Sequence, residues 1–340
     1  MRHASLLLGL LLATITIGSG CDAGAQQGAT PGPRPAAQPA LAEFLFEVTL
    51  GTAPSSAPAG IAADARGTLY VIDSLKDQIR VFDREGNPIA TWGESGSAPG
   101  QFHFTDGSDF WGDLALGLDG NLYILDTFND RIQVLGPDGA FLREWGETGT
   151  GAGQFTSAYG IAVDGAGRVY ITDPRHNRVQ IFDGEGQYLA AWEPSEAQGG
   201  PLFDPTDVAV DPAGVVSVTD HANDQIVRFD AEGTVIDAFG ETGIQPGQLM
   251  GPWGAAVDAA GTLYVAEYHG NRVQVFAPDG TSLGIVGSAG VQPGQVFSPI
   301  YVTISPDGGR LYVSDEGNRR VQVFRLLPPL APATSTPVAN

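Results

Sequence analysis

The sequence predicts an all-β protein, a six-bladed β-propeller of four-stranded antiparallel blades. A short strand motif that ends in an acid returns six times along the chain. Its acidic residues lie at spacings of 53, 47, 47, 47 and 48 residues: Asp73, Asp126, Asp173, Asp220, Glu267 and Asp315. Turn signals rich in Gly, Pro, Asn and Asp divide each unit into four strand-like segments. A repeat of about 47 residues with four strands is typical of one propeller blade.

The third unit illustrates how one blade is predicted. Gly160–Asp164 is a mostly apolar strand, and 168–173 alternates apolar with polar residues as the second strand. Arg178–Phe182 alternates in the same way and forms the third strand. A turn with hairpin chemistry follows, and Tyr188–Trp192 is the fourth strand.

The ring is predicted to close through its N-terminal strand. The six inner strands are expected to begin near equivalent residues: Gly60, Asp113, Gly160, Asp207, Gly254 and Tyr301. The sixth unit stops after its third strand, at Arg325, whereas Phe44–Leu50 resembles the fourth strand of another unit. Pairing of these segments removes the exposed sheet edges and gives a propeller over 43–326, expected to be a monomer.

The N-terminus resembles an export signal. Residues 1–20 combine Arg2, a short apolar stretch from Leu6 to Ile17 and small residues before Cys21, the single cysteine. This arrangement predicts a lipoprotein signal in which Cys21 is lipidated and becomes the mature N-terminus. The position three residues before Cys21 is Gly18 rather than an aliphatic residue, so simple secretion is the alternative.

Two segments outside the propeller have the composition of linkers. Residues 22–42 are rich in Pro and Ala, and 327–340 form a similar tail that is expected to be disordered. With a lipid anchor at Cys21, the chain is expected to be exported and held at a membrane of the cell envelope.

The charge excludes one class of partner. The chain has 17 Lys and Arg against 39 Asp and Glu, a formal net charge of −22. Binding to nucleic acid requires a basic surface for the phosphates, so no nucleic-acid partner is expected. An acidic protein favours basic, cationic or metal-bridged partners.

The repeated motifs resemble the NHL repeat, a family of six-bladed propellers. The residues that carry the resemblance are the Gly-Ile-Ala-Val-Asp strand at 160–164, the Asn-Arg-Val-Gln-Val-Phe segment at 271–276, and the Gly-Gln-Phe segments at 100–102 and 153–155. The family implies a fold and a binding platform. Its members include protein-binding and RNA-binding domains and a lyase, so the resemblance does not name a function.

Function is sought where the blades differ, since residues that recur in most blades are expected to be architectural. The recurring acids and the arginines five residues later, such as Arg131, are predicted to link strands or blades. The connection into the second blade is six residues longer than the others and contains Trp111. This aromatic insertion is predicted either to form a lid or ligand-stacking edge, or to fill the gap between blades.

The start of each inner strand is expected to line the mouth of the central channel, on the face that carries the loops between second and third strands. Trp111, Tyr159, Trp253 and Tyr301 are candidates for the walls of a pocket there. Asp113 and Asp207 replace glycine in two blades and would place two carboxylates near the axis. They could hold a cation such as calcium, take part in acid–base chemistry, or cap the strand start.

Histidines also gather on this predicted face. His176, His221 and His269 lie in the corresponding loops of three consecutive blades, and three histidines could bind zinc. The resemblance also implies that a metal site is possible, because an amidating lyase of the family binds such a metal. The three histidines follow the acid of their repeat by three, one and two residues, so their positions are not equivalent.

The sequence therefore predicts a non-catalytic, envelope-tethered propeller that binds a protein or small molecule on its loop face, without a firmly predicted cofactor. A metal-dependent lyase or a lactonase-like hydrolase at the channel mouth, using zinc or calcium, is the alternative. A purely structural spacer is a third. No Gly-x-Ser-x-Gly, phosphate loop or His-Glu-x-x-His motif is present, so serine or cysteine catalysis is not supported.

Overall fold

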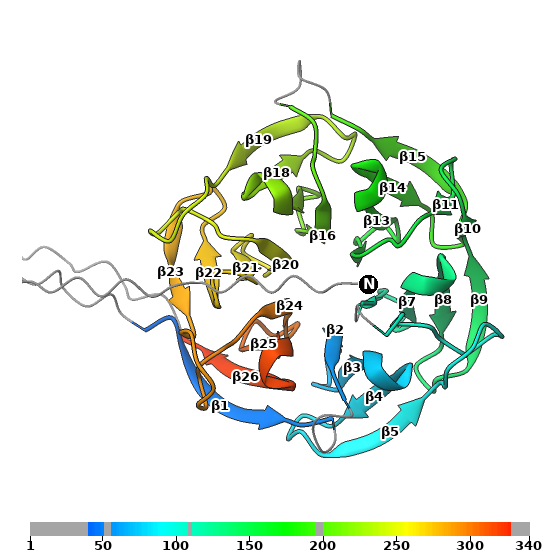
Figure 1. Cartoon of the computed structure of the whole chain (residues 1–340), viewed down its shortest axis with the longest axis horizontal. Helices are drawn as coiled ribbons and strands as arrows, with labels where there is room; N and C mark the ends of the chain where they lie inside the picture. The colour runs from blue at the N-terminus through cyan, green and yellow to red at the C-terminus, as the bar shows by residue number, and fades with distance from the viewer. Residues whose placement is uncertain (1–39, 51–55, 108–110, 195–199, 328–340) are drawn as a thin grey trace, which may run out of the picture. The chain divides into compact units, whose positions relative to one another are not determined.

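The computed structural model describes residues 40–50, 56–107, 111–194 and 200–327. These residues form six four-stranded antiparallel sheets arranged as blades around a central axis (Figure 1). The predicted all-β, six-bladed propeller is confirmed. The predicted signal segment, Cys21 and nearly all of the 22–42 linker lie outside the described residues, as does the tail beyond 327.

The innermost strand of each blade lies next to the axis. These strands are β2 (Pro58–Ala63), β6 (Asp113–Leu116), β12 (Ile161–Val163), β16 (Pro205–Val210), β20 (Pro252–Val257) and β24 (Pro299–Ile304). Four of them begin at a proline, about two residues earlier than the sequence predicted. Proline has no N–H to donate, so the first position of a strand accommodates it.

The second and third strands of each blade are joined by a short loop on one face of the ring. The second strands are β3 (Leu69–Asp73), β7 (Leu122–Asp126), β13 (Val169–Asp173), β17 (Val216–Asp220), β21 (Leu263–Glu267) and β25 (Arg310–Asp315). The third strands are β4 (Gln78–Phe82), β8 (Arg131–Leu135), β14 (Arg178–Phe182), β18 (Gln225–Phe229), β22 (Arg272–Phe276) and β26 (Arg320–Leu326). We call the face that carries these joining loops the loop face, and the opposite one the turn face.

Five of these loops contain a 3₁₀ turn in the described chain. The turns are η1 (Ser74–Lys76), η2 (Thr127–Asn129), η3 (Pro174–His176), η5 (His221–Asn223) and η6 (Glu316–Asn318). The residue after each turn adopts a left-handed conformation, as Asp130 does with φ 52°. Asp130 Oδ1 then accepts a hydrogen bond of 2.8 Å from the backbone N–H of Ser157, at the entrance to the next blade. The loop of one blade therefore positions the start of its neighbour.

The outer strands complete the blades and close the ring. They are β5 (Pro88–Trp92), β9 (Phe141–Trp145), β15 (Tyr188–Trp192), β19 (Val235–Phe239), β23 (Ser282–Val286) and, for the sixth blade, β1 (Ala42–Val48). Strand β1 pairs antiparallel with β26, from Ala42 opposite Leu326 to Val48 opposite Val321. The blue and red strands lie side by side at this closure (Figure 1), as the sequence predicted.

The connections between blades fold back on themselves before entering the next inner strand. In the second of them, β10 (Glu147–Thr148) pairs in parallel with β11 (Gln154–Phe155). Equivalent single bridges join Ser95 to Phe102, Thr242 to Leu249 and Ala289 to Val296. The last residue of each such segment is buried between blades; Phe102 and Phe155 are fully inaccessible.

The recurring Asp and Arg residues are architectural, as predicted. Arg131 Nε lies 2.8 Å from Asp126 Oδ2, and its Nη2 donates to the carbonyl of Gln101 in the preceding connection. Asp126 Oδ1 also accepts the backbone N–H of His103 at 2.7 Å. The pair is buried and ties strand β8 to the connection that enters its own blade. The same acid–arginine pairs recur in three further blades: Asp173 with Arg178, Glu267 with Arg272, and Asp315 with Arg320.

Candidate functional site

Glycine alternates with a larger residue around the axis at the start of the inner strands. In chain order the six positions are Gly60, Asp113, Gly160, Asp207, Gly254 and Tyr301. A Cβ atom on Gly60 would lie 2.4 Å from the Cα of Asp113, and one on Gly160 would lie 2.6 Å from the Cα of Asp207. The inner strands approach so closely here that only alternate blades can carry a side chain.

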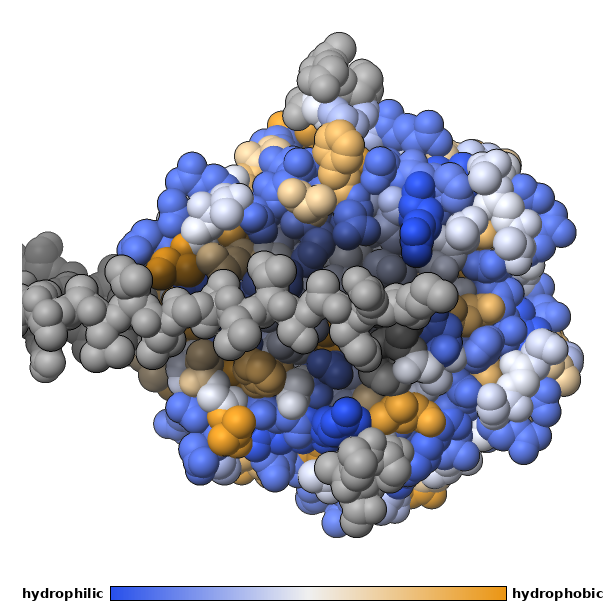
Figure 2. Space-filling model, viewed as in Figure 1, coloured by the Kyte–Doolittle hydropathy of each residue, from blue (hydrophilic) through white to orange (hydrophobic). Residues whose placement is uncertain are grey.

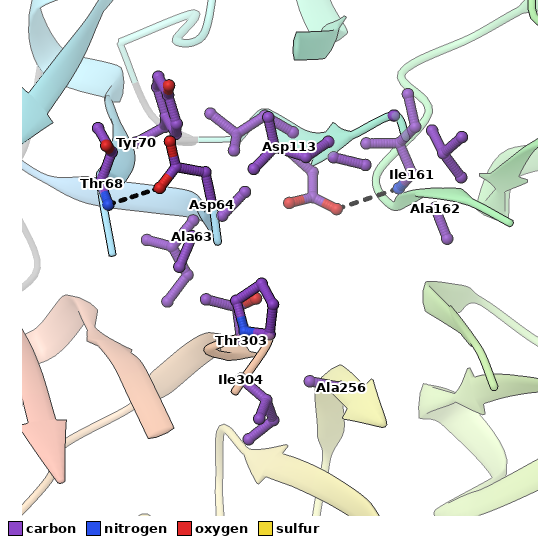
Figure 3. A pocket seen from close by; sticks show the side chains of 18 of the residues that line it. Ala63, Asp64, Thr68, Tyr70, Asp113, Ile161, Ala162, Ala256, Thr303 and Ile304 are labelled. Carbon is purple, nitrogen blue, oxygen red and sulfur yellow. Dashed lines mark hydrogen bonds between the residues drawn. The ribbon is translucent and has the colours of Figure 1, made fainter. Parts of the chain in front are cut away.

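The alternation brings two carboxylates together inside the ring. Asp113 is 5% exposed and Asp207 is 4% exposed. Asp113 Oδ2 accepts a hydrogen bond of 3.0 Å from the N–H of Ile161, and Asp207 Oδ2 accepts one of 2.8 Å from the N–H of Ala255. Each carboxylate thus binds the inner strand of the following blade. Figure 3 shows Asp113 extending into the central space with Ile161 beside it.

Burial changes the protonation of this pair. It raises the pKa of Asp207 to about 7. Burial, followed by the negative charge of Asp207, raises the pKa of Asp113 well above its usual range. Two carboxylates that influence one another in a low dielectric do not both ionise readily, so the pair holds a proton near neutral pH.

Tyr301 completes this set. Its ring is 2% exposed, and its hydroxyl donates a hydrogen bond of 2.8 Å to the carbonyl of Tyr159, across the ring. Burial and the nearby charges of Asp113 and Asp207 raise the pKa of the Tyr301 phenol well above its usual range. The phenol therefore remains protonated and acts as a hydrogen-bond donor. We call Asp113, Asp207 and Tyr301 the axial cluster.

Three predicted aromatic residues stack on one another at the loop-face end of the axis. The rings of Trp111 and Trp253 are stacked with centroids 4.7 Å apart, and Tyr159 lies 5.2 Å from Trp111 and 5.9 Å from Trp253. Trp253 is only 7% exposed. The long connection therefore brings Trp111 over the axis, where it packs against residues of two other blades. Phe104 from the same connection is fully buried and stacks on Phe102; Phe110 lies outside the described residues.

A cavity of about 1040 Å³ extends from the axial cluster toward the turn face. Its central part is walled by three layers of inner-strand residues, and it also extends along the turn face between the first and second blades, past Tyr70, Ile89 and Trp92. The layer next to the cluster is Ile61, Leu114, Ile161, Val208, Ala255 and Val302; the middle layer is Ala62, Ala115, Ala162, Ala209, Ala256 and Thr303; the outer layer is Ala63, Leu116, Val163, Val210, Val257 and Ile304. Exposed turn residues such as Arg66 and Leu118 border its other end. The side chains of the three inner-strand layers are mostly apolar, whereas the end formed by the axial cluster, which we call the floor, is acidic.

From the sequence, a pocket was expected at the other end of this channel. Asp113, Asp207 and Tyr301 were among the predicted site residues and line the cavity, but its walls were not predicted. A signal for the walls was present: the middle layer is Ala in five blades and Thr in the sixth, at one repeat position. Small residues at this position keep the channel open where a larger residue would fill it.

The histidines do not form the predicted ligand set. His176 Nδ1 lies 2.8 Å from Asp173 Oδ1 of its own blade, whereas the rings of His221 and His269 lie 5.9 Å apart beside Trp253. Among the described residues, no group of three or more His, Cys, Asp or Glu side chains lies in a position to hold a metal ion. His176 is thus held by the acid of its own blade.

The axial cluster is also a poor donor set for calcium. It offers two carboxylates and a phenol, and the layer beside it is apolar. Calcium takes six to eight oxygen ligands, so backbone carbonyls or water would have to complete a calcium site here.

Around the ring, the surface is mostly hydrophilic with separate apolar spots (Figure 2), in keeping with the net charge of −22. Most of the aliphatic residues exposed on the outer strands recur at one repeat position: Leu45, Ile89, Leu142, Leu189, Ile236 and Leu283. Because they are spread around the circumference, they do not mark a single site.

Comparison with known proteins supports the fold. Residues 249–276 match the model of the NHL repeat. No curated protein matches the sequence. Among solved structures, virginiamycin B lyase from Staphylococcus aureus superimposes with a TM-score of 0.57 and 16% identity, over 84% of this chain and 100% of that one.

Two further solved structures have the same architecture. A gluconolactonase from Xanthomonas campestris gives a TM-score of 0.59 and 17% identity, over 80% of this chain and 87% of its own. A protein of unknown function from Bacteroides thetaiotaomicron gives 0.62 and 15%, over 83% and 72%. At these identities the likeness concerns the fold alone. The chain is thus a six-bladed β-propeller that carries an NHL repeat.

Proposed function

We propose that this protein is a non-catalytic binding propeller that takes a small molecule into its central channel from the turn face. The observation that carries the proposal is the cavity of about 1040 Å³, which is large enough for a ligand and lined mainly by apolar residues. Stacking of Trp111, Tyr159 and Trp253 at the loop-face end favours a channel ligand over the loop-face partner expected from the sequence.

An uncharged dye tests this proposal without reference to the acidic floor. We expect Nile red to bind the purified protein at one site, with a blue shift of its emission, because the channel walls are apolar. Thr303→Phe would place a ring in the middle layer and should abolish that site. Dye binding that is absent in the wild type, or unchanged in Thr303→Phe, would contradict a ligand site in the channel.

We further propose that the protein is exported and anchored to a membrane of the cell envelope through lipidated Cys21. The short apolar segment before this single cysteine supports the proposal. No helix among the described residues is long and apolar enough to cross a membrane. A radioactive fatty acid should label the wild type but not Cys21→Ser. The variant should also be absent from the membrane fraction. Equal labelling of both proteins would exclude this anchor.

An enzyme is the second candidate, and one observation favours it. The axial cluster places two buried carboxylates with raised pKa values beside a phenol at the end of a cavity, an arrangement that suits proton transfer. The metal-dependent form of this candidate predicts about one zinc or calcium per chain by elemental analysis, lost in Asp113→Asn. Turnover of a lactone or of a lyase substrate, abolished in the same variant, would establish catalysis and displace the binding proposal.

A further inference from the structure

The floor of the channel is acidic and lacks a cationic partner. Asp113 and Asp207 are the acids of the axial cluster, and the third member, Tyr301, directs its hydroxyl to the carbonyl of Tyr159. Of the residues that line the cavity, Arg66 is the one with a basic side chain, and it lies on an exposed turn at the opposite end. Among the described residues that line the cavity, no basic side chain therefore neutralises the floor.

The carboxylates retain capacity for hydrogen bonds. Each accepts a backbone N–H from the next blade, through Ile161 and Ala255, and Asp207 also accepts the N–H of Val208. An ionised carboxylate has about four lone-pair sites. An ammonium group brings three N–H donors and a positive charge, and it would satisfy both the remaining acceptors and the buried charge.

The channel walls limit the shape of the part of the ligand that lies beyond the ammonium group. From Asp207 to Val210 the inner strand β16 advances three residues, which corresponds to about 10 Å at about 3.3 Å per residue. Over this depth the lining side chains are Ala, Val, Leu and Ile with one Thr. An extended apolar segment of about eight carbon atoms would follow the channel from the floor to the turns.

From these observations we propose that the channel selects a molecule with an ammonium head on an apolar body, the head placed against Asp113 and Asp207. The inference rests on the proposed channel-binding function and adds the chemical class of the ligand. An anionic head would add a further negative charge beside the carboxylates. The pair holds a proton near neutral pH, so a neutral head would leave only the remaining negative charge of the pair without a counter-ion, and both heads are therefore disfavoured relative to ammonium.

A series of probes that differ only in the head group tests the selection. We would measure binding of n-octylammonium, n-octanol and octanoate to the purified protein by titration calorimetry at pH 7.5. We expect n-octylammonium to bind at least tenfold more tightly than n-octanol, and octanoate to bind most weakly. Thr303→Phe should weaken the binding of all three, because it narrows the shared apolar path.

The matched variant is the double substitution Asp113→Asn with Asp207→Asn. An asparagine oxygen can still accept the N–H of Ile161 at position 113 and that of Ala255 at position 207, so the links between blades are kept while the charge is removed; the local acceptor for the N–H of Val208 is lost. We expect the preference for ammonium over alcohol to fall to within about twofold, with a thermal midpoint no lower than that of the wild type. If the double variant has a lower thermal midpoint, its ammonium preference would be compared with that of the single variant Asp113→Asn.

The outcomes separate the two proposals. If all three probes bind the wild type equally and Thr303→Phe weakens them, the channel binds ligands but the inferred ammonium selectivity is overturned. If the preference for ammonium survives in the double variant, the carboxylates are not its cause and the inference is also overturned. If Nile red binds in the channel but n-octylammonium does not, the proposed function stands and the ligand class is wrong.

Discussion

At the scale of single residues, the axis is organised by what fits between six closely spaced strands. Gly60, Gly160 and Gly254 leave room, and the larger residues of the next blade occupy it. Asp113 and Asp207 are buried as a consequence, and burial raises the pKa of both carboxyl groups. The lack of space for a side chain at the three glycine positions thus leads to the burial, and to the raised pKa values, of the residues at the other three.

Asp207→Asn should change how stability depends on pH. Burial raises the pKa of Asp207 from 3.8 to about 7, so the folded protein holds a proton that the unfolded chain releases. The stability from this proton is fully present below about pH 4 and is lost as the pH rises through about 7. Asp113 and Tyr301 interact electrostatically with Asp207, so the midpoint belongs to the cluster and not to Asp207 alone. In urea unfolding, Asp207→Asn should gain about 1–3 kcal/mol over the wild type at pH 8 and little at pH 4.

The control for that comparison is Asp138→Asn, an exposed turn residue beyond the axial cluster. This variant should follow the pH dependence of the wild type. Parallel curves for Asp207→Asn and the wild type between pH 4 and pH 8 would mean that the axial carboxylates are not coupled to folding.

Gly60→Ala should destabilise the fold. The new Cβ would lie 2.4 Å from the Cα of Asp113 and 2.9 Å from the N of Leu114, both backbone atoms that cannot move without shifting β6. Overpacking of this kind costs about 1–3 kcal/mol in the free energy of unfolding. Gly165→Ala is the matched control, because nothing lies within 4 Å of its Cβ position. Equal unfolding midpoints for the two variants would refute the close approach of the inner strands.

At the scale of strands and connections, one recurring side-chain cluster joins the second and third strands of a blade to the connection that enters it. An acid at the end of the second strand, an arginine and a glutamine on the third strand, and a carbonyl of the preceding connection meet in a buried set. In the second blade Gln133 Nε2 lies 3.1 Å from Asp126 Oδ2, which Arg131 also contacts. In the first blade the order on the third strand is reversed, with Gln78 first and Arg80 two residues later, and Asp73 interacts with Lys76 at 3.6 Å.

Arg131→Met should be strongly destabilising. It would leave Asp126, a fully buried acid, without its positive partner, and loss of one member of a buried ion pair costs about 3–5 kcal/mol. The comparison is Arg325→Met, which removes an ion pair with Glu43 whose side chains are 57% and 51% exposed, where about 0–1 kcal/mol is expected. Chemical denaturation of both variants measures the difference. Similar losses would show that the buried cluster is not what holds the blade.

At the scale of the whole propeller, closure depends on two segments from opposite ends of the sequence. Strand β1 completes the sixth blade, and Arg320 Nη1 lies 2.7 Å from Glu47 Oε2 across that pairing. On the loop face Arg319 Nη1 donates to the carbonyl of Ser56, which leads into the first blade. The pairing of β1 with β26 therefore gives the last blade its fourth strand and joins the two ends of the propeller.

Deletion of residues 1–49 should open the ring. Without β1, the edge of β26 loses its partner, and an unpaired strand edge invites association. We expect a lower thermal midpoint and concentration-dependent oligomers by size-exclusion chromatography. Deletion of residues 1–39 keeps β1 and should give a monomer with an unchanged midpoint. A monomeric, equally stable 1–49 deletion would show that β1 is not required for closure.

The sequence by itself determined the blades and their number. Alternation within Val169–Asp173, hairpin turns and a near-constant repeat are local properties, and they predicted the sheets and the pairing of β1 with β26. The sequence also showed that Asp113 and Asp207 stand where other repeats have glycine. Local patterns suffice in the first five blades because the paired strands lie close in sequence, whereas the pairing of β1 with β26 followed from the missing fourth strand of the last repeat.

Only the tertiary structure showed what kind of site Asp113 and Asp207 form. Asp113 and Asp207 come from different blades, and their proximity depends on how closely six inner strands surround one axis. The same packing stacks Trp111 on Trp253 and leaves the cavity between the axial cluster and the turn face. These contacts join blades that share no sheet, so the direction in which the channel opens followed from the closed ring and not from any single repeat.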